Sequence, residues 1–207
     1  MVKADGVGSV GNSLTDDATG KSFCAMYRSL EEVLDKGNPF SKIVIVRSAV
    51  PSRELGHLPG SVDEKMEIYE LPYIQICHTL FGRQDAYQRL KEAKNIEFIP
   101  TSYVRGMTLD NCVVLFDEVQ NCTYQEISSV VTRIGYNSKL IMCGDIKQND
   151  LLYKKTDTTG YSKFIDIARS MEEFTEIVFN IDDIVRSDLV KSFIIAEEVY
   201  ESGKNIT

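Results

Sequence analysis

The sequence has little of what metal centres, disulfide scaffolds, membrane proteins and proteins that wrap nucleic acid require. It has two histidines, and neither has a partner at metal-ligand spacing. Its five cysteines include no C-x-x-C pair, and three lie inside apolar runs, so we expect reduced, buried thiols. No apolar run approaches the length of a membrane span and no signal-peptide core is visible, which predicts a cytoplasmic protein without a membrane segment. The net charge of −8 disfavours passive wrapping of nucleic acid, so any contact with DNA or RNA would need a local basic patch.

The 207 residues alternate between short apolar runs and helical patterns. Runs that are apolar on both faces are typical of central parallel strands, and alternation with helices predicts an α/β fold with helices on both faces of the sheet. In such a fold, ligands bind at the carboxyl ends of the strands. The predicted strands cover residues 42–48, 96–100, 112–118, 139–145 and 176–180. The predicted helices cover about residues 21–36, 161–172 and 188–201, and two more follow Ser61 and Thr123, where SVDE and TYQE both fit a capping box. A proline at position 72 should kink or break the helix after Ser61.

Residues 14–30, LTDDATGKSFCAMYRSL, resemble a phosphate-binding loop whose first half has changed. The Walker A pattern G-x-x-x-x-G-K-[ST] turns backbone N–H groups onto phosphates, neutralises them with its lysine and binds Mg²⁺ through its hydroxyl. The second half of the pattern is present as Gly20, Lys21 and Ser22. Thr15 stands in place of the first glycine, and Asp16 and Asp17 add negative charge where a triphosphate would lie. This loop alone is weak evidence for nucleotide binding.

The segment before this loop lacks the apolar strand that a P-loop fold requires. MVKADGVGSVGNSL contains glycines, small residues and isolated valines, with no apolar run. We therefore predict an irregular N-terminal arm over residues 1–17 and a single domain over residues 18–207, with the first strand either missing or altered. A truncated or replaced N-terminal segment would explain this pattern.

Two further motifs follow predicted strands. In VVLFDEVQN, residues 113–121, a buried strand ends in adjacent carboxylates, which places Asp117 to hold Mg²⁺ and Glu118 to orient or deprotonate a water molecule. In CGDIKQND, residues 143–150, the amide of Gln148 can hydrogen-bond a γ-phosphate oxygen and the attacking water. An acidic, solvated strand end and an ordinary polar loop are the alternative interpretations. The order of the three motifs, each at a predicted strand end, favours nucleotide chemistry.

Four blocks of the sequence resemble consecutive blocks of the PhoH-like family, whose members are P-loop ATPases with a core similar to superfamily 1 helicases. The blocks are SAVPSRELGHLPGSVDEKM, TSYVRGMTLDN, LFDEVQNCTYQEISSVVTRIGYNSKLIMCGDIKQNDL and DDIVRSDLV, and the resemblance covers roughly residues 20–200. It implies a three-layer, RecA-like P-loop NTPase fold with a parallel sheet.

The resemblance also implies a role for individual residues. Nucleotide phosphates would be bound by Thr19, Gly20, Lys21 and Ser22, and Mg²⁺ by Ser22 and Asp117. Glu118 would be the second Walker B carboxylate and Gln148 a γ-phosphate sensor. Arg186 resembles an arginine finger that reaches a neighbouring subunit, since the family is associated with ring-like oligomers such as hexamers. Arg133 and Arg105 are the alternatives for that role, and a surface arginine at the start of a helix is the plain interpretation of Arg186.

The resemblance implies an ATP-binding protein that hydrolyses ATP with Mg²⁺, coupled to RNA or single-stranded DNA. The family's loop reads G-x-x-G-T-G-K-[ST], and here Thr15 and Ala18 replace its first two glycines. This change favours the alternative, a catalytically weakened oligomeric or RNA-associated module with a degenerate nucleotide site. A small-molecule kinase is a third hypothesis, but no acceptor-binding or lid segment is visible. Arg47 and Arg53 could contact nucleic-acid phosphates, and a solvated loop is an equally good interpretation of them.

Overall fold

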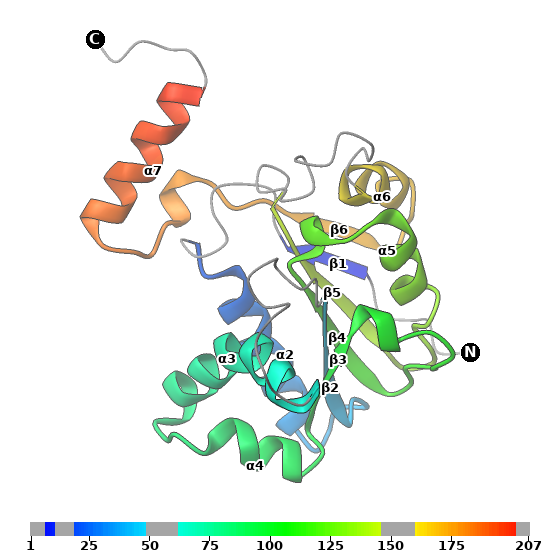
Figure 1. The fold of residues 1–207 in the computed structure, drawn as a ribbon. Coiled ribbons are helices and arrows are strands. Elements are labelled where there is room, and N and C mark those ends of the chain that lie inside the picture. Colours follow the sequence, from blue (N-terminus) through cyan, green and yellow to red (C-terminus); the bar gives the residue numbers. More distant parts are fainter. Residues whose placement is uncertain (1–6, 11–18, 49–61, 146–159, 202–207) are drawn as a thin grey trace.

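The computed structural model describes residues 7–10, 19–48, 62–145 and 160–201. Six parallel strands form one sheet in the order β3-β2-β4-β5-β1-β6 (Figure 1). The strands are β1 Val7–Val10, β2 Lys42–Arg47, β3 Ile96–Pro100, β4 Cys112–Asp117, β5 Lys139–Cys143 and β6 Phe174–Ile177. Each of the five predicted strands overlaps one of them, and the predicted α/β fold with a parallel sheet is confirmed.

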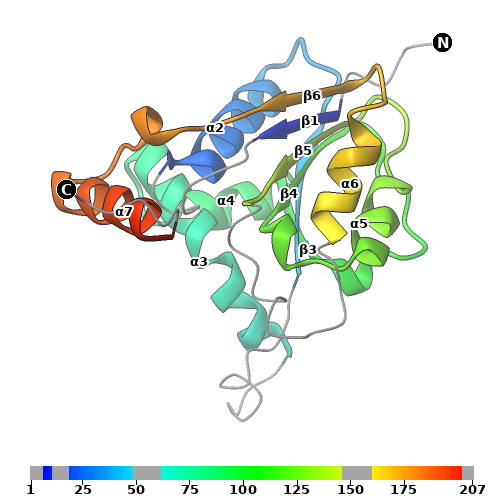
Figure 2. The same cartoon turned by 90° about the horizontal axis from the view of Figure 1, so that it is seen from above.

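Helices cover both faces of the sheet. One face carries α2 Lys21–Leu34, α3 Val62–Phe81 and α4 Ala86–Glu92, and the other carries α5 Tyr124–Val131 and α6 Gly160–Ala168 (Figures 1 and 2). Short 3₁₀ turns lie at Thr101–Tyr103, Val119–Asn121 and Ile181–Asp183. Within the described ranges, no helix combines the length and the apolar composition that a membrane crossing requires.

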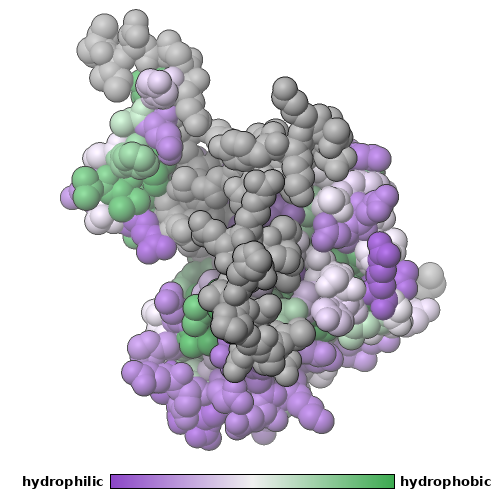
Figure 3. Space-filling model, in the orientation of Figure 1, coloured by the Kyte–Doolittle hydropathy of each residue, from purple (hydrophilic) through white to green (hydrophobic). Residues whose placement is uncertain are grey.

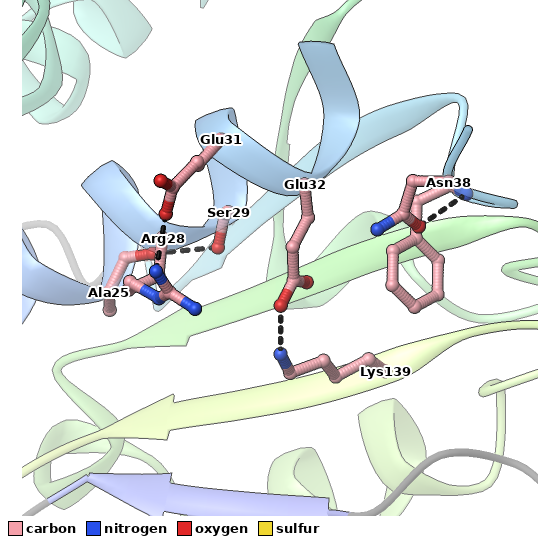
Figure 4. Close-up of polar contacts among 8 residues, drawn as sticks. Ala25, Arg28, Ser29, Glu31, Glu32, Asn38 and Lys139 are labelled. Carbon is pink, nitrogen blue, oxygen red and sulfur yellow. Dashed lines mark hydrogen bonds and ion pairs between the residues drawn. The ribbon is translucent and has the colours of Figure 1, made fainter. Parts of the chain in front are cut away.

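The central strands are buried on both faces because their side chains alternate between two cores. In β2, Val44 and Val46 pack in the core under α5 and α6, whereas Ile43 and Ile45 pack in the core under α2, α3 and α4. Strands β4 and β5 alternate in the same way. This two-sided burial explains why their sequences are continuous apolar runs. At the amino end of β5, Lys139 Nζ also donates to Glu32 Oε1 of α2 at 2.7 Å (Figure 4).

The structure differs from the expected irregular arm at Val7–Val10, which form β1. This strand lies between β5 and β6, with Val7 opposite Leu140 and Phe174. Its sequence VGSV carries no apolar run, so a pattern of side chains could not reveal it. A strand with a neighbour on each side is held by backbone hydrogen bonds, which small residues make as well as large ones.

Two other expectations can be compared with the structure. Pro72 does not break α3, which continues from Val62 to Phe81. Pro72 and Ile68 are both exposed, so water can reach the carbonyl group that the missing N–H leaves unpaired. The predicted capping box at Thr123 is confirmed, because its hydroxyl accepts from the Glu126 N–H while the Glu126 carboxylate accepts from the Thr123 N–H. Thr15, Asp16, Asp17, Ala18, Arg53, His57, Ser61 and Gln148 lie outside the described residues.

The five cysteines are free thiols. Four of them are buried, as expected, and Cys24 is exposed on α2. Burial raises the pKa of the Cys77 thiol to about 11, so this side chain is a protonated core residue at neutral pH.

Helix α7, Asp188–Glu201, stands apart from the sheet and its covering helices (Figure 1). Ile194 packs against Ile184, whereas Leu189, Phe193 and Tyr200 are exposed. Apolar atoms accordingly gather on the surface of this helix (Figure 3).

Helix α6 begins directly against the capping box of α5, and this contact yields a prediction. A Cβ added at Gly160 would lie 2.1 Å from the Tyr124 backbone nitrogen and 2.5 Å from the Thr123 carbonyl carbon. Backbone atoms cannot rotate away, so we expect Gly160→Ala to lower the free energy of unfolding by about 1–3 kcal/mol in urea titrations. Gly37→Ala is the matched control, because its Cβ would make only ordinary contacts, 3.5 Å or more, with Asp35. Equal stability of the two variants would contradict the packing.

Candidate functional site

A cavity of about 520 Å³ opens at the carboxyl ends of β2 and β4, beside the start of α2. Its volume is in the range typical of small-molecule sites. The predicted site contributes Gly20, Ser22, Asp117, Glu118 and Arg186 to the lining. The other lining residues are Phe23, Arg47, Pro72, Gln75, Ile76 and Thr79.

The first turn of α2 forms the wall of the cavity that is suited to anions. Gly20 has φ 71° and ψ 25°, a left-handed conformation that glycine adopts without strain, and its carbonyl accepts the N–H of Cys24 at 2.9 Å. The amino end of a helix carries unsatisfied N–H groups and the positive end of the helix dipole. Lys21 is fully buried, and its Nζ donates to Thr19 Oγ1 at 3.5 Å. These four residues, 19–22, therefore supply N–H groups, a hydroxyl and a buried cation at one place.

Asp117 lies at the end of β4 with only 2% of its surface exposed. Its Oδ1 accepts from Ser22 Oγ at 2.8 Å, and its Oδ2 accepts from Tyr73 OH, also at 2.8 Å. Burial, and next the negative charge of Asp117, raise the pKa of Tyr73 well above its ordinary value. The phenol is therefore a permanent neutral donor to the carboxylate.

Ser22 and Asp117 together fit a Mg²⁺ site. A hydroxyl and a carboxylate oxygen at hydrogen-bond distance are the hard ligands that Mg²⁺ prefers. Among the described residues, no group of three or more His, Cys, Asp or Glu side chains is placed to hold a metal ion. Mg²⁺ usually binds through one or two protein ligands plus phosphate and water, and Ser22 and Asp117 would supply two.

Glu118 follows Asp117 in a left-handed backbone conformation, with φ 54° and ψ 41°. A residue with a side chain is strained there, and such strain clusters at functional sites. Its Oε2 accepts from Gln120 Nε2 at 2.6 Å, and its Oε1 lies 3.7 Å from Arg47 Nη2. The two oxygens are thus directed toward different partners.

Arg47 lines the cavity. It lies at the end of β2, and its cation faces Glu118. Burial lowers its pKa, but Tyr73, Glu118 and Asp117 together outweigh this effect and raise it. Arg47 is therefore a permanent cation in the cavity lining.

The three candidate arginine fingers lie in different parts of the structure. Arg186 lines the cavity of its own chain. Arg105 is exposed and does not line the cavity. Arg133 lies near the amino ends of the strands, where its carbonyl accepts the N–H of Leu109 at 2.9 Å just before β4 begins.

Sequence reasoning missed Tyr73 and Gln120. Tyr73 appears in the sequence as one apolar position of a helix, and its contact with Asp117 depends on how α3 packs. A polar residue shortly after two carboxylates is expected in an exposed loop, so the sequence offers little reason to single out Gln120. In the structure its side chain is only 2% exposed.

Comparison with known proteins agrees with this geometry. The family model described as "PhoH-like protein" matches residues 8–198. "PhoH-like protein" of Bacillus subtilis is 34% identical over 177 residues, which cover 85% of this chain and 54% of that protein. "PhoH-like protein" of Synechocystis is 34% identical over 189 residues, 90% of this chain and 55% of that protein, and "Protein PhoH" of Escherichia coli K12 is 31% identical over 172 residues, 82% and 48%. The chain spans about half the length of the curated relatives it matches.

The Tyr73–Asp117 contact yields a prediction for stability. Tyr73→Phe removes the donor to a buried carboxylate, so we expect a loss of about 1.5–3 kcal/mol in the free energy of unfolding, measured in urea. Tyr136→Phe, at a side chain that is 83% exposed, is the control and should change nothing.

The same contact sets a pH dependence. Because the folded-state pKa of Tyr73 is raised, its stabilisation is complete below the unfolded-state pKa of about 10 and is lost as the pH rises beyond it. The difference between the wild-type protein and Tyr73→Phe should therefore shrink above about pH 10. A difference that grows in this range would contradict a neutral phenol donor.

Proposed function

Because the chain belongs to the PhoH-like family, we propose that it binds ATP in the cavity at the carboxyl edge of the sheet and hydrolyses it with Mg²⁺. One observation carries the proposal. The hydroxyl of Ser22, in the loop that would hold phosphate, lies 2.8 Å from the carboxylate of Asp117, which is 95 residues away in the sequence. Two motifs that separately suggest Mg-nucleotide chemistry therefore form one site.

Binding would depend on the first turn of α2. The N–H groups of this turn and the helix dipole favour the phosphates, and Gly20 lets the backbone approach them closely. Lys21, fully buried beneath the turn, would add its positive charge to that of the helix dipole opposite the phosphates. When bound, Mg²⁺ would neutralise phosphate charge, with Ser22 and Asp117 as its protein ligands.

Hydrolysis would depend on Glu118. Its carboxylate would accept a proton from a water molecule as that water attacks the γ-phosphorus and the bond to the β–γ bridging oxygen breaks. Arg186 and Lys21 would meet the charge that develops on the phosphate oxygens. Gln148, outside the described residues, would orient the same water.

The finer parts of the proposal concern partners. The resemblance to helicase-like ATPases supports coupling of hydrolysis to RNA or single-stranded DNA, and it supports a ring-like homo-oligomer. The alternative remains a catalytically weakened oligomeric or RNA-associated module, which the Thr15-Asp16-Asp17 sequence favours. Nucleotide binding separates the two, because only the first requires it.

Calorimetry with Mg-ATP tests the proposal directly. The wild-type chain should bind with a micromolar dissociation constant, Lys21→Ala should weaken binding at least about tenfold, and Lys36→Ala, at an exposed position after α2, should bind like the wild type. Because Lys21 is buried, circular dichroism must show that its variant is folded. No heat from any of the three folded proteins would overturn ATP binding and favour the degenerate module.

The position of Arg186 predicts that it acts in its own chain. Arg186→Ala should lower the rate of phosphate release by about 10³-fold or more, whereas Arg105→Ala, at an exposed site outside the cavity, should not. Mixing Arg186→Ala with Lys21→Ala separates two arrangements. If each chain supplies its own arginine, every site in the mixture lacks one essential group and activity stays low. Recovery of activity on mixing would show that the arginine is donated between subunits.

A further inference from the structure

A single buried amide connects the end of β4 to the end of β5. Gln120 lies in the 3₁₀ turn Val119–Asn121, directly after the two carboxylates. Its Nε2 donates to Glu118 Oε2 at 2.6 Å, and its Oε1 accepts the backbone N–H of Asp145 at 3.1 Å. Both ends of the amide are therefore engaged, one with the carboxylate that would activate water and one with the main chain of the neighbouring strand end.

The amide is fixed in place by close packing. A Cβ added at Gly144 would lie 3.2 Å from Gln120 Oε1 and 3.2 Å from the ring of Tyr161, so the amide packs tightly against this glycine. Tyr161 and Asp145 are themselves buried. Gln120 can therefore hold one position, and its donor is presented to Glu118 at a constant place.

Glu118 needs such a restraint because a competing partner is close. Arg47 Nη2 lies 3.7 Å from Oε1, the other carboxylate oxygen, and this cation is always protonated. If the 2.6 Å bond to Gln120 were removed, the carboxylate would turn toward Arg47 and form a closer ion pair. A carboxylate turned in this way would no longer hold its oxygens where they can meet an attacking water.

We infer that Gln120 is a positioning residue, which holds the carboxylate of Glu118 away from Arg47 and ties its position to the end of β5. The inference rests on the proposed function, since it concerns the hydrolytic step at the same site. Gln120 contributes no surface to the cavity, so it should affect turnover and leave nucleotide binding unchanged.

Two substitutions at Gln120 test its two contacts. Gln120→Met removes both hydrogen bonds while keeping the shape of the side chain. Gln120→Glu keeps an oxygen for the Asp145 N–H but removes the donation to Glu118. Both should lower kcat by about tenfold to hundredfold, the loss typical of residues that orient a reacting group, with a dissociation constant for Mg-ATP within about twofold of the wild type. Gln88→Met is the matched control, because Gln88 Nε2 donates to Glu92 Oε1 at 3.2 Å on the exposed surface of α4.

A double-mutant cycle separates positioning from a general loss of structure. If Gln120 acts through Glu118, Gln120→Met should cause almost no further loss of kcat in a Glu118→Gln background. A full, independent loss in that background would overturn the inference, as would a wild-type kcat in both Gln120 variants. An equal loss of kcat and ATP affinity would overturn it too. If the wild-type chain does not hydrolyse ATP, the proposed function falls and the inference falls with it, whereas the other outcomes overturn the inference alone.

Discussion

The buried carboxylate of Asp117 is the constraint on which the site depends. An ionised group taken out of water is stabilised only if other groups replace its hydration, and here a hydroxyl from α2 and a phenol from α3 do so. Those two bonds fix the strand β4 and the helices α2 and α3 relative to one another. The arrangement of Ser22 beside Asp117 thus follows from an electrostatic requirement of the fold as much as from the needs of a ligand.

Charge around this carboxylate is organised in a chain of contacts. Arg47 faces Glu118, Glu118 accepts from Gln120, and Gln120 accepts from the backbone of Asp145. Each acidic oxygen in the chain has a donor in a different direction. A site built in this way is stiff before any ligand arrives, which is the condition for electrostatic stabilisation of a transition state at low reorganisation cost.

How much the sequence could predict depends on what kind of information each element carries. Strands β2, β4 and β5 could be predicted from the sequence because burial on both faces makes them continuous apolar runs. The two carboxylates at the end of β4 could be predicted as site residues because charged residues directly after such a run are unusual. Strand β1 could not be predicted, because it is held by backbone pairing with two neighbouring strands and its sequence has no apolar pattern. The role of Tyr73 depends on its contact with Asp117, which is distant in the sequence, and that of Gln120 depends on the burial of its turn against Asp145. Neither kind of contact can be recognised from the neighbouring residues in the sequence.

The place of β1 also constrains the order in which the chain can fold. Residues 7–10 lie between β5 and β6, which follow much later in the sequence, so β1 has no neighbour until β2, β3, β4 and β5 have been synthesised. Strands β2, β3 and β4 can pair earlier, because their partners lie closer in the sequence. Closing the loop between β1 and its neighbours costs chain entropy that only late contacts repay. On the ribosome, the turn at residues 19–22 that follows β1 would therefore be among the last of these segments to reach its final conformation.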